Sequence, residues 1–469
     1  MQSQPPTRNF RSINPATNQV VAEFPFLTDE EVNKKIEVAW ESFKKLRETD
    51  FESRRQKIVK FASILEQNPE KYAKLVTEEM GKPLKAAIGE VLFSANQAKY
   101  YVEKSEKLLK PHEYTSGAKK SLVEYHPIGP VFYIVPFNFP FFLSFVGTVP
   151  CLLLGNTVLY RPADSCPRVG KAIEELMIEA GFTNNEFQTV FTSPEQTELV
   201  LSNKYIRGTS FTGSTRSGRV IASIAGKYAK KATMELGGSD PFLVLDDANI
   251  DKAVTTALDS RLNNCGQVCC AGKRFIIADS IFDEFKKKLV EKVAEYKVGD
   301  PMKEDTQMGP LARPDLLANI ERQVQEGVKQ GGKLLFGGKR PEEPELKAGN
   351  FYIPAVFELD NPENILFKEE TFGPVFALVR VKGEEEMVRL ANDTEYGLGC
   401  TIVSENVERA QKLGKKIDTG TVVVNGKVFP DIPVPFGGVK GSGFGRQYGE
   451  FGMHEFANIK TVTVDESLN

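Results

Sequence analysis

The chain has 469 residues, of which 41% are hydrophobic and 26% are charged, a composition typical of folded globular proteins that excludes long disorder and collagen-like repeats. Its length predicts two or three domains. Lys and Arg (60) nearly balance Asp and Glu (63), and no basic or acidic block stands out, so the sequence predicts neither a nucleic-acid nor a membrane partner.

Cysteine and histidine usage narrows the chemistry further. The six cysteines are too few for a secreted disulfide framework, and no apolar stretch follows the first residues, so we expect a cytoplasmic protein. The three histidines (His112, His126 and His454) form no Cys/His cluster, so we expect no metal site.

The first third of the chain turns helical after a short extended region. Apolar residues at helical spacing predict helices over 29–46, 51–79 and 86–109. From residue 121 on, alternating or continuous apolar runs predict strands at 121–125, 131–135, 157–160, 189–191 and 205–211. A helix is predicted among them at about 169–180.

The second half repeats this alternation. Helices are predicted at 250–262 and 281–296, and strands at 241–245, 274–278, 376–381, 401–403 and 421–424. Residues 300–349 are rich in Gly, Pro and charge, which indicates loops and exposed helices, and residues 460–464 alternate like an edge strand. Strand–helix alternation predicts an α/β fold with parallel sheets covered on both faces.

One uncharged segment, between Pro127 and Tyr160, is long enough to suggest a membrane span. Its internal prolines Pro136, Pro140 and Pro150 argue against a helix that faces lipid. We therefore expect a buried strand, a turn and a buried helix there.

Two short stretches indicate nucleophilic and acid–base chemistry. Asn-Cys-Gly-Gln-Val-Cys-Cys at 264–270 places Cys269 in a connection between a predicted helix and strand, where catalytic groups concentrate. Glu235, followed by two glycines, suits a general base with a raised pKa. The structural alternatives are that Cys269 and Cys270 pack as small buried side chains and that Glu235 lies on the surface at a turn.

Two further stretches indicate ligand contacts. Phe-Thr-Gly-Ser-Thr-Arg-Ser-Gly at 211–218 joins a strand to a helix and suits a phosphate at the helix N-terminus, although its glycine spacing is not that of the dinucleotide fingerprint. Asn138 in Pro-Phe-Asn-Phe-Pro at 136–140 ends a buried strand, where a buried amide needs a partner.

Together these stretches closely resemble the NAD(P)-dependent aldehyde dehydrogenases. The resemblance continues through Glu-Glu-Thr-Phe-Gly-Pro at 369–374 and Pro-Phe-Gly-Gly-Val-Lys-Gly-Ser-Gly at 435–443. Order and spacing agree too, since Cys269 follows Glu235 by 34 positions. The overall pattern is most similar to bacterial-type succinate-semialdehyde dehydrogenases.

The resemblance implies an aldehyde-dehydrogenase-like α/β fold in three parts. A Rossmann-like cofactor domain comprises residues 1–112 and 128–236, and an α/β catalytic domain comprises residues 237–445. A β-strand oligomerisation arm comprises residues 113–127 and 446–469, which implies a homodimer or homotetramer.

It also implies oxidation of an aldehyde to a carboxylate with NAD or NADP as acceptor. The Cys269 thiolate attacks the aldehyde, Asn138 with the Cys269 N–H forms the oxyanion hole, and Glu235 activates the water that hydrolyses the thioester. The implied cofactor contacts are Phe137, Arg161, Asp164, Gly213, Ser214, Gly218, Leu236, Glu370 and Phe372.

Two other functions compete with this one. A CoA-acylating semialdehyde dehydrogenase generally lacks the general-base glutamate, and Glu235 is present. A catalytically silent binding protein on the same scaffold is disfavoured because the matched catalytic positions are intact.

The chain departs from the family pattern at several positions. Arg161 replaces the usual Lys and Phe137 the usual Trp, and Cys265 and Cys270 near the nucleophile leave open either a reversible disulfide with Cys269 or inert packing. Asp164 occupies the position of an acid that accepts the adenosine 2′-hydroxyl, which predicts NAD, with NADP as the alternative.

The substrate stays open at this stage. Val146 and Asn263 stand where succinate-semialdehyde enzymes use arginines to bind the distal carboxylate. The expected substrate contacts are Phe139, Phe142, Val146, Val268 and Phe436, with Phe137 at the mouth, and they favour medium-chain aliphatic or aromatic aldehydes. Overall resemblance instead favours succinate semialdehyde.

Overall fold

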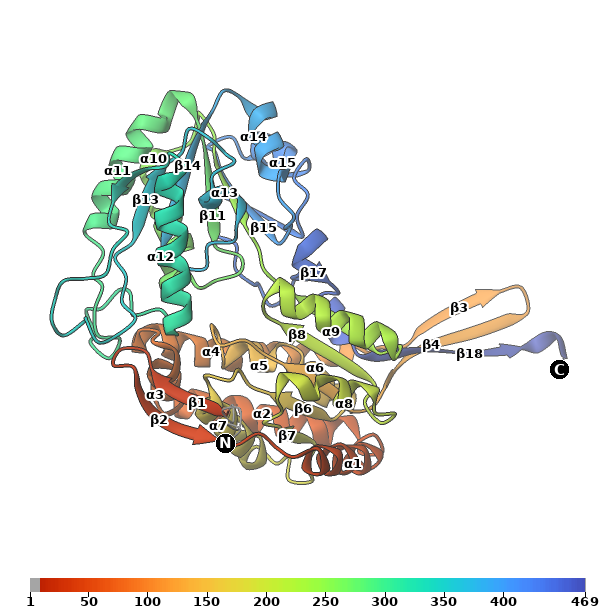
Figure 1. Cartoon of the computed structure of the whole chain (residues 1–469). Helices are drawn as coiled ribbons and strands as arrows, with labels where there is room; N and C mark the ends of the chain where they lie inside the picture. The colour runs from red at the N-terminus through yellow and green to blue at the C-terminus, as the bar shows by residue number, and fades with distance from the viewer. Residues whose placement is uncertain (1–8, 469) are drawn as a thin grey trace.

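The structure, a computed structural model, describes residues 9–468. It has two halves, each built around its own β-sheet, and a long β ribbon that extends away from both and ends at the C-terminus (Figure 1). The predicted α/β class with two parallel sheets is confirmed.

The N-terminal part forms a hairpin and four helices. Strands β1 (Phe10–Asn14) and β2 (Gln19–Phe24) pair antiparallel, and helices α1 (Asp29–Leu46), α2 (Phe51–Gln67), α3 (Pro69–Met80) and α4 (Leu84–Leu108) follow. Thr28 and Glu31 form a capping box that fixes the start of α1 at the predicted residue. The single helix predicted over 51–79 is wrong, because Pro69 can begin a helix but cannot continue one.

The first sheet has six strands in the order β17-β9-β8-β5-β6-β7. They are β5 (Val131–Ile134), β6 (Val158–Arg161), β7 (Phe187–Thr189), β8 (Gly208–Thr212), β9 (Lys231–Glu235) and β17 (Gly443–Phe444). All neighbours are parallel except β17, which pairs antiparallel with β9 and so joins this sheet from a distant part of the chain. Helices α7 (Pro167–Glu179), α8 (Thr197–Ser202) and α9 (Thr215–Lys227) belong to this half together with α1–α4.

The uncharged segment folds as expected, into a buried strand, a turn and buried helices. Strand β5 leads through the turn at 135–141 into α5 (Phe142–Val146) and α6 (Thr148–Leu154), and every residue of α6 is buried. Within residues 9–468, no helix is long and apolar enough to cross a membrane.

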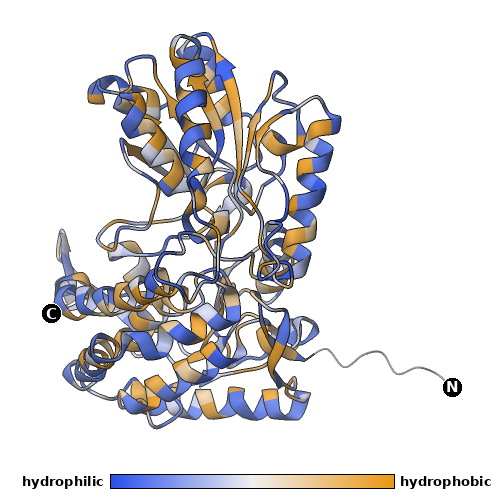
Figure 2. Cartoon of the chain, turned by 90° about the vertical axis from the view of Figure 1, so that its left-hand side faces the viewer, coloured by the Kyte–Doolittle hydropathy of each residue, from blue (hydrophilic) through white to orange (hydrophobic). Residues whose placement is uncertain are grey.

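The second sheet has seven strands in the order β12-β13-β14-β11-β10-β15-β16, parallel except for β12. They are β10 (Asp240–Val244), β11 (Gly272–Ala278), β12 (Lys333–Phe336), β13 (Ala355–Glu358), β14 (Val375–Val381), β15 (Gly399–Val403) and β16 (Thr421–Val424). The accompanying helices are α10 (Ile250–Leu262), α11 (Phe282–Ala294), α12 (Pro314–Lys329), α13 (Ile365–Lys368), α14 (Glu384–Asn392) and α15 (Val407–Gly414). In Figure 2 these strands are mostly hydrophobic, while the helices around them carry both colours, as expected for a sheet covered on both faces.

The ribbon is a three-stranded antiparallel sheet. It joins β3 (His112–Ser116), β4 (Lys119–Pro127) and β18 (Ala457–Asp465), the last of which follows α16 (Gly449–His454). Apolar side chains along β18 are exposed, among them Ile459 at 59% and Val464 at 52%. The predicted C-terminal edge strand is therefore present.

Candidate active site

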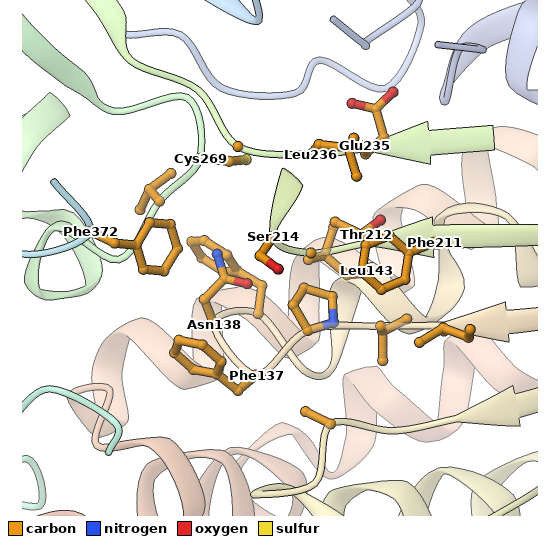
Figure 3. A pocket seen from close by; sticks show the side chains of 18 of the residues that line it. Phe137, Asn138, Leu143, Phe211, Thr212, Ser214, Glu235, Leu236, Cys269 and Phe372 are labelled. Atoms are coloured by element: carbon orange, nitrogen blue, oxygen red, sulfur yellow. The ribbon is translucent and has the colours of Figure 1, made fainter. Parts of the chain in front are cut away.

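A cavity of about 680 Å³ lies between the two halves of the molecule. Its lining comes from the carboxyl ends of β5, β6, β8 and β9 on one side and from the loop before β11 on the other. The carboxyl ends of parallel strands are the edge at which α/β sheets usually bind ligands. Figure 3 shows side chains that line this cavity, including those of Cys269, Glu235 and Asn138, with the Glu235 carboxyl turned away from Asn138.

All but two of the predicted site residues line this cavity. The exceptions are Gly218 and Val146. Gly218 lies in α9, where a Cβ would overlap the Leu236 side chain, so it allows helix and strand to pack closely. Val146 is buried in α5 and belongs to the apolar cluster of Phe139 and Phe142, so it supports the aromatic wall from behind.

The loop that carries Cys269 has an unusual backbone. Asn264 (φ 52°), Cys265 (φ 57°) and Gly266 (φ 71°) are consecutive left-handed residues, and a Cβ at Gly266 would overlap the Gly373 carbonyl. Left-handed non-glycine residues each cost about 1–3 kcal/mol and persist only where the surroundings hold them. Here the Asn264 amide donates to the Asn138 carbonyl at 2.7 Å, which ties the nucleophile loop to the neighbouring turn.

The environment of Cys269 favours its thiolate. The Cys270 thiol donates a hydrogen bond that lowers the pKa of Cys269, burial opposes this, and the nearby Lys273 ammonium lowers the pKa further. Burial and the hydrogen bond to Cys269 hold the pKa of Cys270 well above its usual range. A lowered pKa marks Cys269 rather than Cys270 as the reactive cysteine.

One of the two side-chain amide hydrogens of Asn138 has no acceptor within residues 9–468. Its Nδ2 donates to the Gln267 carbonyl at 2.9 Å, which uses one of its two hydrogens and fixes the orientation of the amide. The residue is 4% exposed and lines the cavity. The second hydrogen is therefore available to an oxygen that develops negative charge.

Glu235 is a buried carboxyl at the end of β9. Neither of its oxygens has a hydrogen-bond partner within residues 9–468. Burial raises the pKa of Glu235 well above its usual range, the neighbouring Cys269 raises it further, and Arg446 lowers it. A perturbed carboxyl in a cavity is typical of an acid–base catalyst. In Figure 3 Leu236 lies between Glu235 and Cys269.

The residues of the cofactor side fit a dinucleotide. Ser214 caps α9, where its Oγ accepts from the Ser217 N–H at 3.3 Å, and the open helix N-terminus suits a phosphate. Glu370 accepts from the Gly238 N–H at 3.1 Å and offers a carboxylate to a ribose. Phe372 and Phe137 meet edge to face at 6.2 Å, and both line the cavity.

Arg161 and Asp164 form an ion pair at the other end of the cavity. Arg161 donates to Asp164 Oδ1 at 2.6 Å, to the Thr192 carbonyl at 3.0 Å and to the Pro162 carbonyl at 3.2 Å. The side chain of Asp164 is 54% exposed, whereas that of Arg161 is 9% exposed.

Sequence reasoning missed several lining residues, including Leu143, Arg313, Phe429, Gln447 and Tyr448. Phe429 packs against Phe139 and Phe142 and extends the aromatic wall. Arg313 lies 4.7 Å above the Phe137 ring and binds both oxygens of Asp315 at 2.9 Å. None of these lies in a recognisable motif; the short distance from Phe429 to the stretch at 435–443 was the one available signal.

Comparison with known proteins defines the class. The profile of the Aldehyde dehydrogenase family matches residues 1–462, so the chain belongs to this family. It is an aldehyde dehydrogenase that oxidises an aldehyde with NAD(P), as the sequence predicted.

Several relatives are similar over nearly their whole length. The chain is 39% identical to the "Probable succinate-semialdehyde dehydrogenase [NADP(+)]" of Synechocystis sp., covering 97% of this chain and 99% of that one. It is 37% identical to the "Succinate semialdehyde dehydrogenase [NAD(P)+] Sad" of Escherichia coli, covering 98% and 99%. The crystal structure of succinic semialdehyde dehydrogenase from Streptococcus pyogenes in complex with NADP+ superposes with a TM-score of 0.94 at 35% identity, covering 97% and 99%.

Proposed function

We propose that this enzyme oxidises an uncharged aldehyde through a covalent intermediate on Cys269. The observation that carries this proposal is that Cys269, Asn138 and Glu235 line one cavity, where the Glu235 carboxyl has no hydrogen-bond partner within residues 9–468. The Cys269 thiolate adds to the aldehyde carbon, and the free amide hydrogen of Asn138 stabilises the resulting oxyanion. Loss of one such donor typically slows the reaction about 10²–10³-fold.

The remaining groups complete the cycle. Ser214, Glu370 and Phe372 would hold NAD(P)+, which when bound would accept the hydride that the thiohemiacetal carbon loses as the adduct becomes a thioester on Cys269. Glu235 then takes a proton from water, and the hydroxide cleaves the thioester on Cys269 to release the carboxylate. In this scheme the part built on the six-stranded sheet (1–112 and 128–236) binds the cofactor, and residues 237–445 supply the nucleophile.

NAD is the proposed preferred cofactor. By family resemblance Asp164 stands for the acid that contacts the adenosine ribose, so its negative charge would repel a 2′-phosphate, and Arg161 already donates to three protein acceptors. NADP is the second candidate, because the printed names of the Synechocystis and Streptococcus relatives specify NADP.

The substrate side of the cavity favours an alkyl or aryl chain. Phe139, Phe142, Phe429 and Phe436 form its wall, and burial of each methylene there contributes about 0.8 kcal/mol. The arginines on the described cavity lining, Arg161 and Arg313, are both in ion pairs with aspartates. A distal carboxylate would therefore lose water without gaining a free cation.

Succinate semialdehyde is the second candidate substrate, favoured by the names of the similar proteins. The deciding experiment measures kcat/KM for hexanal, benzaldehyde and succinate semialdehyde in one preparation. We expect hexanal or benzaldehyde to exceed succinate semialdehyde. A preference of about tenfold or more for succinate semialdehyde would contradict the apolar-pocket argument.

The ribbon is proposed to act as an oligomerisation arm in a homodimer or homotetramer. Its exposed apolar residues, including Ile459, Val462 and Val464, lie on an edge strand that invites pairing with another chain. Sedimentation of an active monomer would refute this.

We place the enzyme in the cytoplasm, where its six free thiols would stay reduced.

A further inference from the structure

The side chain of Lys273 is buried directly behind the nucleophile. Lys273 lies in β11, its side chain is 1% exposed, and its Nζ donates to the carbonyl of Cys269 at 2.6 Å and to that of Val268 at 3.0 Å. A buried ammonium is retained only where several acceptors hold it. Two of its acceptors are the backbone carbonyls of the nucleophile and of the residue before it.

The same ammonium reaches the cofactor side of the cavity. Its Nζ lies 3.4 Å from Glu370 Oε1, and that oxygen also accepts from the Gly238 N–H. Gly238 in turn packs against the Cys269 carbonyl so closely that a Cβ there would come within 2.6 Å of it. Lys273 thus links the nucleophile loop to the carboxylate that faces the cofactor.

We propose that Lys273 is a positioning residue, which fixes the Cys269 backbone and couples the charge of Glu370 to the reactivity of the Cys269 thiol. The proposal rests on the proposed function, in which Cys269 is the nucleophile and Glu370 contacts the cofactor ribose. The ammonium favours the thiolate, and the carboxylate of Glu370 partly neutralises the ammonium.

The charged and titratable groups around Cys269 give the direction of each effect. Cys270 and Lys273 favour the thiolate, whereas Asp240 and Glu370 oppose it. Glu235 also interacts with Cys269, but it is the proposed general base, so its substitution would alter proton transfer as well. The charge of Lys273 can therefore be removed by substitution without changing a residue that is proposed to transfer protons.

The test measures alkylation of Cys269 by iodoacetamide against pH, without cofactor, with the labelled site identified by mass spectrometry. Lys273→Gln keeps a donor and loses the charge, whereas Lys273→Arg keeps the charge. Alkylation follows the thiolate fraction. We therefore expect Lys273→Gln to raise the midpoint of the alkylation rate against pH by about one pH unit, which makes alkylation about tenfold slower at pH 7. Lys273→Arg should restore most of the wild-type profile.

The matched control is Lys286→Gln. Lys286 pairs with Glu358 at 3.0 Å in the same half of the molecule but lies off the cavity lining, so its profile should match wild type. Identical profiles for Lys273→Gln and Lys273→Arg would overturn the proposal, because charge would then have no effect.

A second variant keeps Lys273 in place and so tests the coupling even if Lys273→Gln fails to fold. Glu370→Gln should move the midpoint down, with faster alkylation at pH 7, and an unchanged midpoint would overturn the proposal. Cys269→Ala distinguishes failure of the proposed function from failure of the inference about Lys273. If it keeps labelling and turnover, the proposed function fails; if it loses both while the Lys273 and Glu370 variants match wild type, only this inference fails.

Discussion

The ammonium of Lys82 pairs with the carboxylate of Glu90 in the interior, beneath the turn that carries Asn138. Lys82 also donates to the Asn138 carbonyl at 3.1 Å, and Glu90 accepts from the N–H groups of Phe141 and Phe142. Both side chains are 2% exposed. This pair anchors the backbone on both sides of the oxyanion residue.

Lys82→Met should therefore impair both stability and catalysis. Removing one partner of a buried pair leaves an uncompensated charge, at a cost of about 3–5 kcal/mol. We expect a lower urea midpoint and a lower kcat with little change in KM, because the Asn138 turn loses its support. Lys57→Met, which breaks the pair with Glu186 away from the cavity, should leave kcat unchanged. An equal fall of kcat in both variants would contradict a role specific to the turn.

Glu235→Gln should separate hydride transfer from hydrolysis. Without the base, the thioester on Cys269 accumulates, so stopped-flow absorbance should show one burst of NADH and then a near-zero steady state. Full steady-state activity would exclude Glu235 as the general base.

The same variant should be more stable than wild type, increasingly so as pH rises. Because burial raises the pKa of folded Glu235, the unfolded chain releases its proton at a lower pH than the folded chain. The folded state then binds more protons, and stability falls with pH above the ordinary glutamate range until the raised folded pKa is passed. Glutamine removes this penalty, so the gain in Tm should be larger at pH 8 than at pH 5.

Cys269→Ala should abolish turnover, whereas Cys270→Ala should keep most of it and shift its pH dependence. Cys270 donates the hydrogen bond that lowers the pKa of Cys269, so its loss should move the rising limb of the rate profile to higher pH. Cys265→Ala is the control, since this buried thiol lies in the strained loop and does not line the cavity. A profile for Cys270→Ala that matches Cys265→Ala would contradict this.

Local signals explain which elements the sequence predicted. Helix α10 and strand β16 match their predicted bounds, because the N-cap Asn249 marks the start of α10 and β16 is a short run of β-branched residues. Strand β9 was missed, since Lys231–Glu235 has no run of apolar residues and gains its place by pairing with β8. The motifs placed Cys269, Glu235 and Asn138 on one cavity, but the contacts of Lys82 and Lys273 join distant segments and leave no periodic pattern.

Asp164→Ser should move cofactor preference toward NADP. The substitution removes the carboxylate and releases one N–H of Arg161 for a 2′-phosphate. We expect the ratio of kcat/KM for NADP to that for NAD to rise, with kcat for the aldehyde nearly constant. A wild-type ratio that already favours NADP would overturn the proposed preference for NAD.

Gly266→Ala should cost both stability and activity, because this position has no room for a side chain. Gly266 has φ 71°, and a Cβ would overlap the Gly373 carbonyl in the segment that carries Phe372. Gly89→Ala is the matched control, because Gly89 is exposed in α4 with nothing within 4 Å of its Cβ position. Its free energy of unfolding should rise by about 0.5–1 kcal/mol. Thermal unfolding and single-turnover rates check both variants. If Gly266→Ala retains wild-type Tm and burst rate, the left-handed turn before Cys269 does not require glycine.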